Sequence, residues 1–348
     1  MSVVDLLVRL APLIGARIEL EPQAREAGCI VFASGYRSYF WMNRFELNAT
    51  PLARICQDKG LAAHFLVERG FRVAEWLVVS PSSRKHFGDD SHGLEAARAF
   101  ADRIGRPVFV KPLSMSQGRL VRLVQTDSEL DYAVNEIWRE MALRRGRRLA
   151  LVQARCTGPE YRIVVLEGAV LAAYERSPLQ VLGDGRSSVA DLLDARAQQF
   201  VRDGRDLLEL PIEDPRIDET LKRAGLNRRS VLPVGKRLSL FDLANLSLGG
   251  TAENCLERMH PALRELACRV ASALHLTFCG IDMFISEIDT AASSYEIIEV
   301  NSAPGLDDSV FAGTAQGDRV DDLYLRLLAA LERRSGLLGF EGVAGERS

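Results

Sequence analysis

The stretch CGIDMFISEIDTAASSYEIIEVNSAPG, residues 279–305, decides the fold. Its two apolar ends predict a pair of strands joined by a polar turn. Asp282 interrupts the first strand, and Glu299 and Asn301 lie two positions apart in the second. Because side chains alternate across a strand, Glu299 and Asn301 share a face, and strand pairing can bring Asp282 beside them. Two carboxylates and an amide oxygen suit Mg²⁺ that also binds nucleotide phosphates. The alternative interpretation is that all three are solvent-facing positions on half-buried strands.

The composition of the 348-residue chain is that of a globular protein, with 47% apolar and 26% charged residues. These values exclude disordered, collagen-like and coiled-coil chains. The net charge of −3 gives no basic field that would favour nucleic acid. No apolar run reaches the ~18–20 residues of a membrane span, and six scattered cysteines without a CxxC pair predict neither disulfides nor a zinc site. We therefore expect a cytoplasmic protein without a nucleic-acid or membrane partner.

Short β-rich runs alternate with longer amphipathic periods, which predicts a mixed α/β (α+β) fold. Residues 1–50 predict only irregular strands. The clearest later elements are helices over 51–69, 93–105, 128–146, 261–275 and 320–334, and strands at 73–80, 107–112, 119–124, 149–154, 235–240, 279–286 and 295–301. We also expect a helix cap at Asp127 and a hairpin over 160–175 that turns at Glu167-Gly168.

Lys111 ends the buried strand at 107–112 and is one of only five lysines. In a chain so rich in arginine, a retained lysine points to a role for a compact ammonium. Lys111 can reach phosphate oxygens, and the loop Ser114–Gly118 can lay backbone N–H groups over them. No GxxxxGK[ST] motif occurs, so this is not a Walker A loop. The alternatives are an ordinary hairpin with an exposed lysine here and a solvated helix lysine at Lys59.

The segment LALVQARCTGPEYR, residues 149–162, predicts a strand that leads into a bend. Such a bend can offer backbone groups to the edge of an adenine. Glu160 is placed to accept ribose hydroxyls, and Arg162, on the same face, could face a phosphate or a developing anion. A hinge with surface charges explains the segment equally well.

Taken in their order along the chain, these segments resemble the ATP-grasp superfamily. The resemblance is strongest to the carboxylate–amine ligase module of the cyanophycin-synthetase type, which is related to glutathione synthetases. The resemblance covers about residues 45–335 and is densest over 161–306. It includes YRIVV at 161–165, VLAAYERSPLQVLGDGRSSVADLL at 170–193, DLANLSLGGTAENCLERMHP at 242–261, GIDMF and EVNSAPG.

The resemblance implies an ATP-grasp fold, in which two α+β subdomains clasp ATP behind an amino-terminal pre-ATP-grasp segment. We accordingly expect that segment at 1–50, the first subdomain at 51–156, the second at 157–335 and a loose tail at 336–348.

The resemblance also implies a role for each candidate residue. The catalytic residues would be Lys111 and Arg162. The ATP-binding residues would be Lys59 and Lys111 at the phosphates, Ser114, Ser116 and Gly118 in a lid, Gln153, Ala154, Arg155 and Cys156 in an adenine hinge, and Glu160 at the ribose. Asp282, Glu299 and Asn301 would hold two Mg²⁺ ions, with Mn²⁺ as an alternative. Ser247, Gly249, Gly250 and Thr251 would lie near an acyl-phosphate, where their amides would form an anion nest.

The implied activity is that of an ATP-dependent carboxylate–amine ligase, which joins amino acids or short peptides through an acyl-phosphate and releases ADP and phosphate. A small-molecule kinase on the same fold is the alternative, and an ATP-binding protein without turnover is a third reading. No Mur-ligase-like domain follows, so we expect a single amide bond rather than an iterative polymer. Gly280 stands where the D-alanine ligase branch has an arginine, which argues against that substrate. Homo-oligomerisation is left open.

Overall fold

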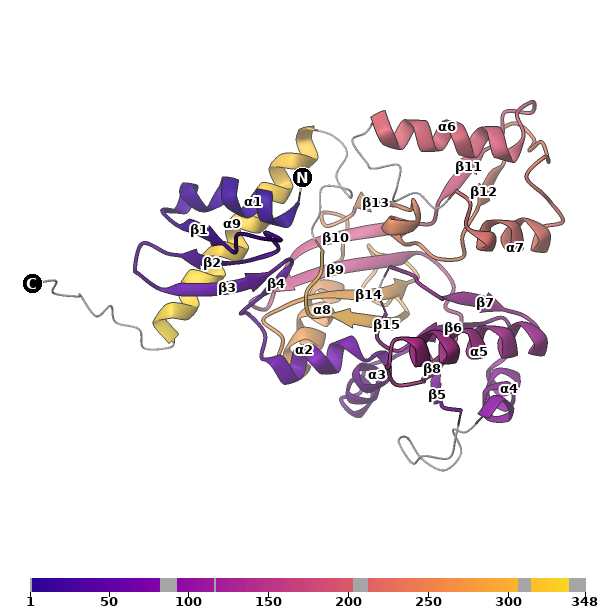
Figure 1. Ribbon diagram of the computed structural model, residues 1–348, viewed down its shortest axis with the longest axis horizontal. Coiled ribbons are helices and arrows are strands. Elements are labelled where there is room, and N and C mark those ends of the chain that lie inside the picture. The colour runs from indigo at the N-terminus through magenta and orange to yellow at the C-terminus, as the bar shows by residue number, and fades with distance from the viewer. Residues whose placement is uncertain (1, 82–92, 116, 203–211, 306–313, 338–348) are drawn as a thin grey trace, which may run out of the picture.

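The computed structural model describes residues 2–81, 93–115, 117–202, 212–305 and 314–337. These residues form a central sheet, a second sheet beneath it, an amino-terminal layer and a smaller insertion (Figure 1). The mixed α/β prediction is confirmed. No helix within the described ranges is both long and apolar enough to cross a membrane.

The central sheet has five antiparallel strands in the order β13-β10-β9-β14-β15. Its strands are β9 (Glu160–Leu166), β10 (Ala169–Ser177), β13 (Thr251–Asn254), β14 (Phe278–Ile285) and β15 (Tyr295–Asn301). The predicted turn at Glu167-Gly168 joins β9 to β10, with φ of 50° and 76° at its two residues. Helix α8 (Pro261–Ala273) packs on one face at β9, β10 and β14, and the two helices at residues 50–68 cover β15. All of them share an apolar cluster that includes Ile163 and Ile281.

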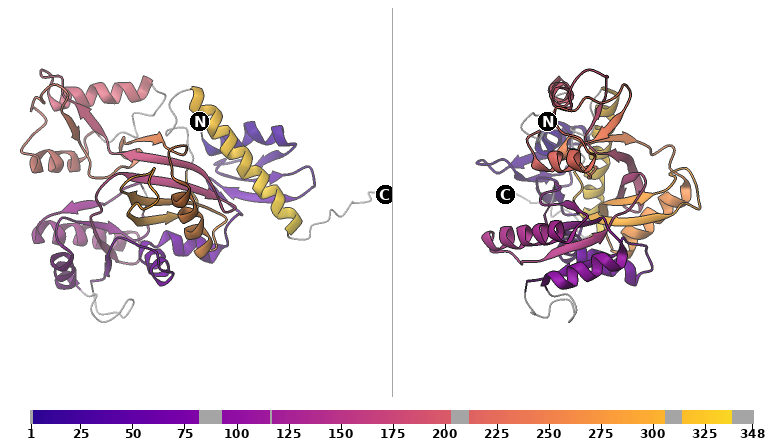
Figure 2. Two further views of the ribbon diagram at one scale, coloured as in Figure 1. Left: turned by 180° about the vertical axis from the view of Figure 1, so that it is seen from behind. Right: turned by 90° about the vertical axis from the view of Figure 1, so that its right-hand side faces the viewer.

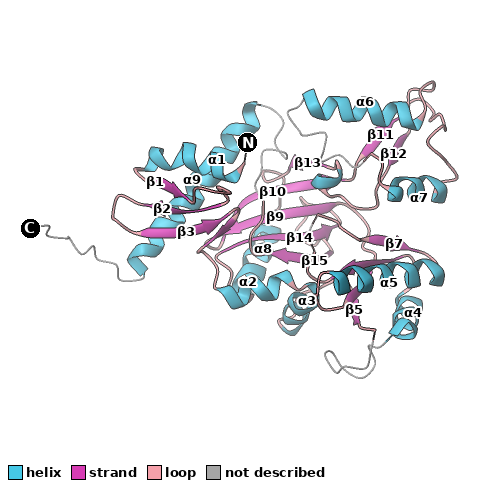
Figure 3. Ribbon diagram, in the orientation of Figure 1, coloured by secondary structure: helices cyan, strands magenta, loops and turns pink. Residues whose placement is uncertain are grey.

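The second sheet has the antiparallel order β5-β8-β6-β7. Figure 3 distinguishes the strands of the protein from its helices by colour. It comprises β5 (Trp76–Val79), β6 (Val108–Pro112), β7 (Arg122–Val124) and β8 (Ala150–Ala154), and helices α4 (Gly93–Ile104) and α5 (Asp127–Leu143) pack on one face. The cap of α5 is Thr126, whose hydroxyl accepts from the amide of Glu129, so the predicted cap at Asp127 is wrong by one residue. Thr126 and Glu129 satisfy each other's backbone N–H in a capping box, which a lone Asp127 could not do.

The predicted helix over 51–69 is two helices, α2 (Thr50–Gln57) and α3 (Lys59–Glu68). The break falls at Asp58, which has extended backbone angles and accepts from the amides of Gly60 and Leu61. A side-chain cap of this kind starts a new helix. Lys59 is therefore the first residue of α3, not a mid-helix lysine.

The amino-terminal layer is more ordered than the sequence predicted. Helix α1 (Val3–Leu10) starts at a Ser2/Asp5 capping box, a short 3₁₀ turn follows, and β1–β4 form a meander. The strands are β1 (Arg17–Leu20), β2 (Ala27–Val31), β3 (Arg37–Trp41) and β4 (Arg44–Phe45). Helix α9 (Thr314–Leu337) is longer at both ends than predicted and lies along this layer (Figure 2). It packs there through Tyr324, and its Asp321 pairs with Arg9.

The insertion follows β10 and has its own apolar core, which includes Leu193, Ile217 and Leu240. It contains the two-stranded sheet of β11 (Gln180–Leu182) and β12 (Arg237–Ser239) and the helices α6 (Val189–Arg202) and α7 (Pro215–Arg223). The chain then enters the 3₁₀ turn Leu246–Leu248 and returns to the central sheet as β13.

Candidate active site

One face of the central sheet carries apolar side chains at one end of its strands and polar side chains at the other end. At one end, Val164, Tyr174 and Phe278 pack into the amino-terminal layer. At the other end the same face carries polar side chains: Glu160, Arg162, Arg176, Asp282, Glu299 and Asn301. Because apolar residues and the helices α2, α3 and α8 cover the opposite face, this polar end is where the sheet can meet a charged ligand.

The strand pairing brings the predicted metal-binding residues together. Asp282 is the register partner of Glu299, and Gly280 is that of Asn301. A bulge between Asp282 and Met283 accompanies this register. With its amide oriented to satisfy its neighbours, Asn301 donates to Glu299 Oε1 at 2.8 Å and accepts from Arg162 Nη2 at 3.1 Å.

The donor set fits the implied Mg²⁺ chemically. Two carboxylates and one amide oxygen are hard ligands that leave room for phosphate oxygens and water. Within the described ranges no group of three or more His, Cys, Asp or Glu side chains could hold a metal. The assignment of Asp282, Glu299 and Asn301 therefore stays a prediction.

Asp282 is held by two arginines. Arg162 Nη2 lies 2.6 Å from Asp282 Oδ2, its Nε lies 2.5 Å from Oδ1, and Arg176 Nη1 lies 3.3 Å from Oδ2. Burial alone would raise the pKa of the Asp282 carboxyl, but the charges of Arg162 and Arg176 outweigh it and hold that pKa below its usual value. The carboxylate is thus ionised in the buried site.

Glu160 also contacts Arg176, but its pKa shifts in the opposite direction to that of Asp282. Arg176 Nη1 lies 3.2 Å from Glu160 Oε1. Burial raises the pKa of Glu160 to about 7, against the opposing charge of Arg176. Arg176 Nε is buried and makes no hydrogen bond to any part of the chain that the structure describes. The site therefore contains an arginine with an unused donor.

Lys59 approaches the polar end from the start of α3. Its Nζ lies 3.5 Å from Glu299 Oε2 and donates to the Met115 carbonyl at 3.1 Å. Its own amide donates to the Leu113 carbonyl at 3.2 Å, which ties the start of α3 to the segment after β6. Lys59 thus links Glu299 of the central sheet to the segment that follows β6 of the second sheet.

Lys111 is buried on the face of the second sheet that is turned away from α4 and α5. Burial, followed by the charge of Lys59, lowers the pKa of Lys111 to about 8. Gln153, also buried, lies on the same face, because it pairs with Phe109 and Lys111 pairs with Leu151. Both residues therefore lie on the face opposite α4 and α5, and the charges of Glu299 and Glu160 act on Lys111 there.

One residue that the sequence analysis did not single out, Glu296, lies beside the predicted hinge at residues 153–156. The Ala154 amide donates to the Glu75 carbonyl at 2.8 Å, and Arg155 is exposed. Burial raises the pKa of the Cys156 thiol to about 12, and the nearby Glu296 carboxylate adds to the shift. Glu296 thus lies at the hinge. It stands three residues before Glu299, in a strand where only the alternate positions had been considered.

The lid and the predicted substrate loop touch each other. Gly118 has φ of +65°, and a Cβ there would lie 3.0 Å from Leu248 Cδ1 and 3.3 Å from Asn245 Nδ2. Ser114 is exposed, and Ser116 falls outside the described residues. The backbone at Gly118 is therefore packed against the segment that contains Asn245 and Leu248.

The predicted anion nest is not formed in this structure. The amide of Ser247 donates to Asn245 Oδ1 at 2.9 Å, and the amides of Gly249 and Gly250 donate to the carbonyls of Leu246 and Asn245 at 3.0 Å. These N–H groups are used within the loop. Thr251 begins β13 and pairs with Ser177, one residue beyond Arg176.

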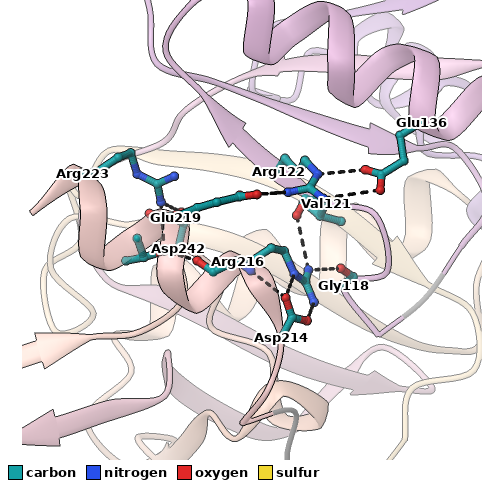
Figure 4. A network of polar contacts seen from close by, with 10 residues as sticks. Gly118, Val121, Arg122, Glu136, Asp214, Arg216, Glu219, Arg223 and Asp242 are labelled. Carbon is teal, nitrogen blue, oxygen red and sulfur yellow. Dashed lines mark hydrogen bonds and ion pairs between the residues drawn. The ribbon is translucent and has the colours of Figure 1, made fainter. Parts of the chain in front are cut away.

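A polar network joins the base of the lid to the insertion (Figure 4). Arg216 on α7 donates to the carbonyls of Gly118 at 2.7 Å and Val121 at 3.3 Å. Arg122 lies between Glu136 on α5, at 2.9 Å, and Glu219 on α7, at 2.6 Å. The insertion thus holds the lid from one side.

Comparisons with known proteins agree with this architecture. The family described as RimK-like ATP-grasp domain matches residues 241–316. Cyanophycin synthetase from Nostoc sp. is 35% identical over 253 residues, which are 72% of this chain and 26% of that protein. The glutathione biosynthesis bifunctional protein GshAB from Desulfotalea psychrophila is 25% identical over 353 aligned positions, 99% of this chain and 42% of that protein.

Among solved structures, a bifunctional glutathione synthetase from Pasteurella multocida has a TM-score of 0.56 at 23% identity, over 90% of this chain and 42% of that one. The chain thus spans about a quarter of the cyanophycin synthetase and less than half of the bifunctional proteins. Residues 241–316 therefore match the RimK-like ATP-grasp domain family, and the chain shares its fold with the glutathione synthetase structure.

Proposed function

We propose that the protein is an ATP-dependent carboxylate–amine ligase that joins amino acids or short peptides and releases ADP and phosphate. The observation that carries the proposal is the convergence of Lys59 and Glu299, 3.5 Å apart, at the junction of the two sheets. Cationic groups from one subdomain there face a carboxylate–amide set from the other. The relatives are named as synthetases, which favours a ligase over the alternative kinase.

The proposal assigns ATP to the space between the sheets. Lys59 and Lys111 bind its phosphates, the hinge at 153–156 binds the adenine, and Glu160 accepts from the ribose. The subdomains are 51–156 and 157–335, behind the amino-terminal segment 1–50 and before the tail at 336–348. We place the enzyme in the cytoplasm.

Two Mg²⁺ ions at Asp282, Glu299 and Asn301 complete the proposed site, and when bound they neutralise phosphate charge. The side chains of the protein hold cationic groups in fixed positions for the reacting oxygens. Asp282 and Asn301 hold the Arg162 guanidinium in one orientation, which prepares it for an anionic oxygen. Arg176, with its unused Nε donor, offers a second fixed cation at the same place.

The chemistry then follows from charge and water exclusion. A carboxylate is a poor acyl donor, so the acid substrate takes the γ-phosphoryl group and becomes an acyl-phosphate. The amine attacks its carbonyl carbon, the C–N bond forms, and phosphate leaves. Residues around Gly118, which meet Leu248 and Asn245 in this structure, shield the anhydride from hydrolysis.

The test is ATP turnover by the full chain with Mg²⁺ and pools of amino acids and dipeptides. ADP, phosphate, pyrophosphate and product masses are scored together, with Lys111→Met as the inactive control. The proposal expects ADP, phosphate and a product of mass acid plus amine minus water. ADP with a phosphorylated product and no amine requirement would establish the kinase instead, and AMP with pyrophosphate would exclude an acyl-phosphate route.

A further inference from the structure

Glu296 of β15 is a half-buried carboxylate to which the proposed function gives no role. The register between β14 and β15 skips Ile298, which forms a bulge. Because of this bulge, Ile297 is buried in the apolar cluster that α8 covers. Glu296 pairs with Phe284, which is two residues from Asp282 and therefore lies on the same face. The bulge thus adds the Glu296 carboxylate to the polar face of the central sheet.

The distance of Glu296 from Glu160 across the sheet suits a nucleoside. Phe284 pairs with Glu160 on one side and with Glu296 on the other, so the three residues form one row across β9, β14 and β15. Two strand spacings separate the glutamates, which is about 10 Å and comparable to the length of a nucleoside. Phe284 is half-buried and belongs to none of the apolar clusters that the described residues form. An aromatic ring in that place suits stacking by a base.

Glu296 also lies next to the predicted adenine hinge. The segment 72–75 joins the two places, because it forms backbone hydrogen bonds of 3.0 and 3.2 Å with Ile297 of β15 and one of 2.8 Å with Ala154 of β8. The charge and the hydrogen bonding of the Glu296 carboxylate reach the thiol of Cys156, two residues further along the hinge. A base whose edge meets the hinge backbone would therefore have Glu296 within reach.

Glu296 differs from the other glutamates of the polar face in its partners. Glu160 pairs with Arg176 at 3.2 Å. Glu299 pairs with Lys59 at 3.5 Å. Among the residues that the structure describes, no arginine, lysine or histidine forms an ion pair with Glu296. An ionised carboxylate only accepts hydrogen bonds, so a donor on a ligand is the partner it suits.

We propose that Glu296 selects adenine over guanine, because its carboxylate accepts a hydrogen bond from the 6-amino group of ATP. Guanine has the acceptor O6 in place of that amino group, so GTP would set two acceptors against each other. This inference deepens the proposed function and rests on it for the adenine at the hinge and the ribose at Glu160. It adds a side chain that reads the base where the hinge offers mainly backbone groups.

The test is calorimetric titration of ATP and of GTP into the full chain with Mg²⁺ and without acid or amine. We expect ATP to bind at least 100-fold more tightly than GTP, since GTP leaves the carboxylate without a donor. In Glu296→Gln, whose amide can turn to donate to O6, this ratio of dissociation constants should fall at least tenfold. Glu253→Gln removes the same charge from an exposed position of β13 and should keep the ratio within twofold of the wild type.

A second variant, Glu296→Ala, separates recognition of the amino group from a structural role. The comparison ligand is the triphosphate of purine riboside, which lacks the 6-amino group. The wild type should prefer ATP to it at least tenfold, and in Glu296→Ala that preference should shrink at least fivefold. An unchanged ratio of GTP to ATP in Glu296→Gln, an undiminished preference in Glu296→Ala, or no binding of ATP by the wild type would each overturn the assignment.

The outcomes for Glu296 and for the ligase are distinguishable. If the protein couples an acid to an amine and Glu296→Gln keeps the wild-type ratio, the role of Glu296 is removed and the ligase stays. If the ratio falls in Glu296→Gln but no acid and amine are coupled, the selection of adenine stays and the ligase is removed. Circular dichroism melting checks that each variant folds.

Discussion

Glu160 and Arg176 face each other across the β9–β10 hairpin because a bulge between Val170 and Ala172 shifts the register by one residue. Beyond the turn, Val170 pairs with Val165, but Ala172 pairs with Val164. Without that shift Glu175 would lie opposite Glu160, and two like charges would meet. The bulge therefore brings a cation into the site and leaves Glu175 to the other face, where it pairs with Arg258.

Replacing Arg176 tests whether the cation that the bulge brings into the site contributes to the reaction. Arg176→Gln removes the cation shared by Glu160 and Asp282, and we expect kcat/KM to fall at least 100-fold in the coupling assay. Arg258→Gln, which changes the neighbouring exposed pair, should stay within twofold. Circular dichroism melting checks that both variants fold. Similar activity in the two variants would remove Arg176 from the site.

The buried pair of Arg162 and Asp282 should dominate local stability. Asp282→Asn leaves two buried guanidinium groups without their shared counter-charge, so we expect the free energy of unfolding to fall by about 3–5 kcal/mol. Asp321→Asn breaks the exposed pair with Arg9 and should cost about 1 kcal/mol or less. Urea denaturation measures both. A loss of equal size in the two variants would contradict the charge argument.

The low pKa of Lys111, about 8, predicts a pH dependence of ATP binding. Phosphate favours the ammonium form, so above pH 8 the free protein must take up a proton to bind. The dissociation constant of ATP should then rise by up to about tenfold per pH unit between pH 8 and 10. Titration calorimetry should show this rise in the wild type and in Lys222→Met, an exposed lysine, and a flat profile in Lys111→Met. A flat wild-type profile would be incompatible with this role.

The sequence predicted the strand pair that contains Asp282 and Glu299 because both signals were local: alternation within a strand and a short turn between strands. Lys59 was harder to place, since the apolar period runs through Asp58 and only the side-chain cap ends the helix there. Arg176 could not be singled out among the many arginines, because a bulge has no signal in the hydrophobic pattern and changes which residue faces the site. Contacts between distant segments, such as Arg216 with Gly118, were not predictable at all.

That contact leads to a prediction about the lid. Arg216→Met removes the donor that holds the carbonyls of Gly118 and Val121, so hydrogen exchange at the amides of residues 118–121 should quicken at least tenfold. The KM for ATP should rise at least threefold as the lid loses its anchor. Arg228→Met, which breaks a pair with Asp218 on the same helix, is the matched control and should change neither quantity. If exchange quickens equally in both, the effect belongs to α7 as a whole.

Glu160 should make stability fall as the pH rises. Its pKa of about 7 in the folded protein lies above its ordinary value of 4.5, because burial disfavours the charged carboxylate. Below pH 4.5 it is protonated in both states and carries no penalty. Between pH 4.5 and 7 the unfolded chain releases the proton first, so unfolding becomes easier, by up to about 3 kcal/mol at pH 8. Glu160→Gln cannot ionise, and its unfolding free energy relative to the wild type should rise by that amount from pH 4.5 to 8. Glu253→Gln, an exposed control on β13, should give a profile of unfolding free energy against pH that is parallel to that of the wild type. A parallel profile for Glu160→Gln would instead show that Arg176 compensates the buried charge of Glu160 fully.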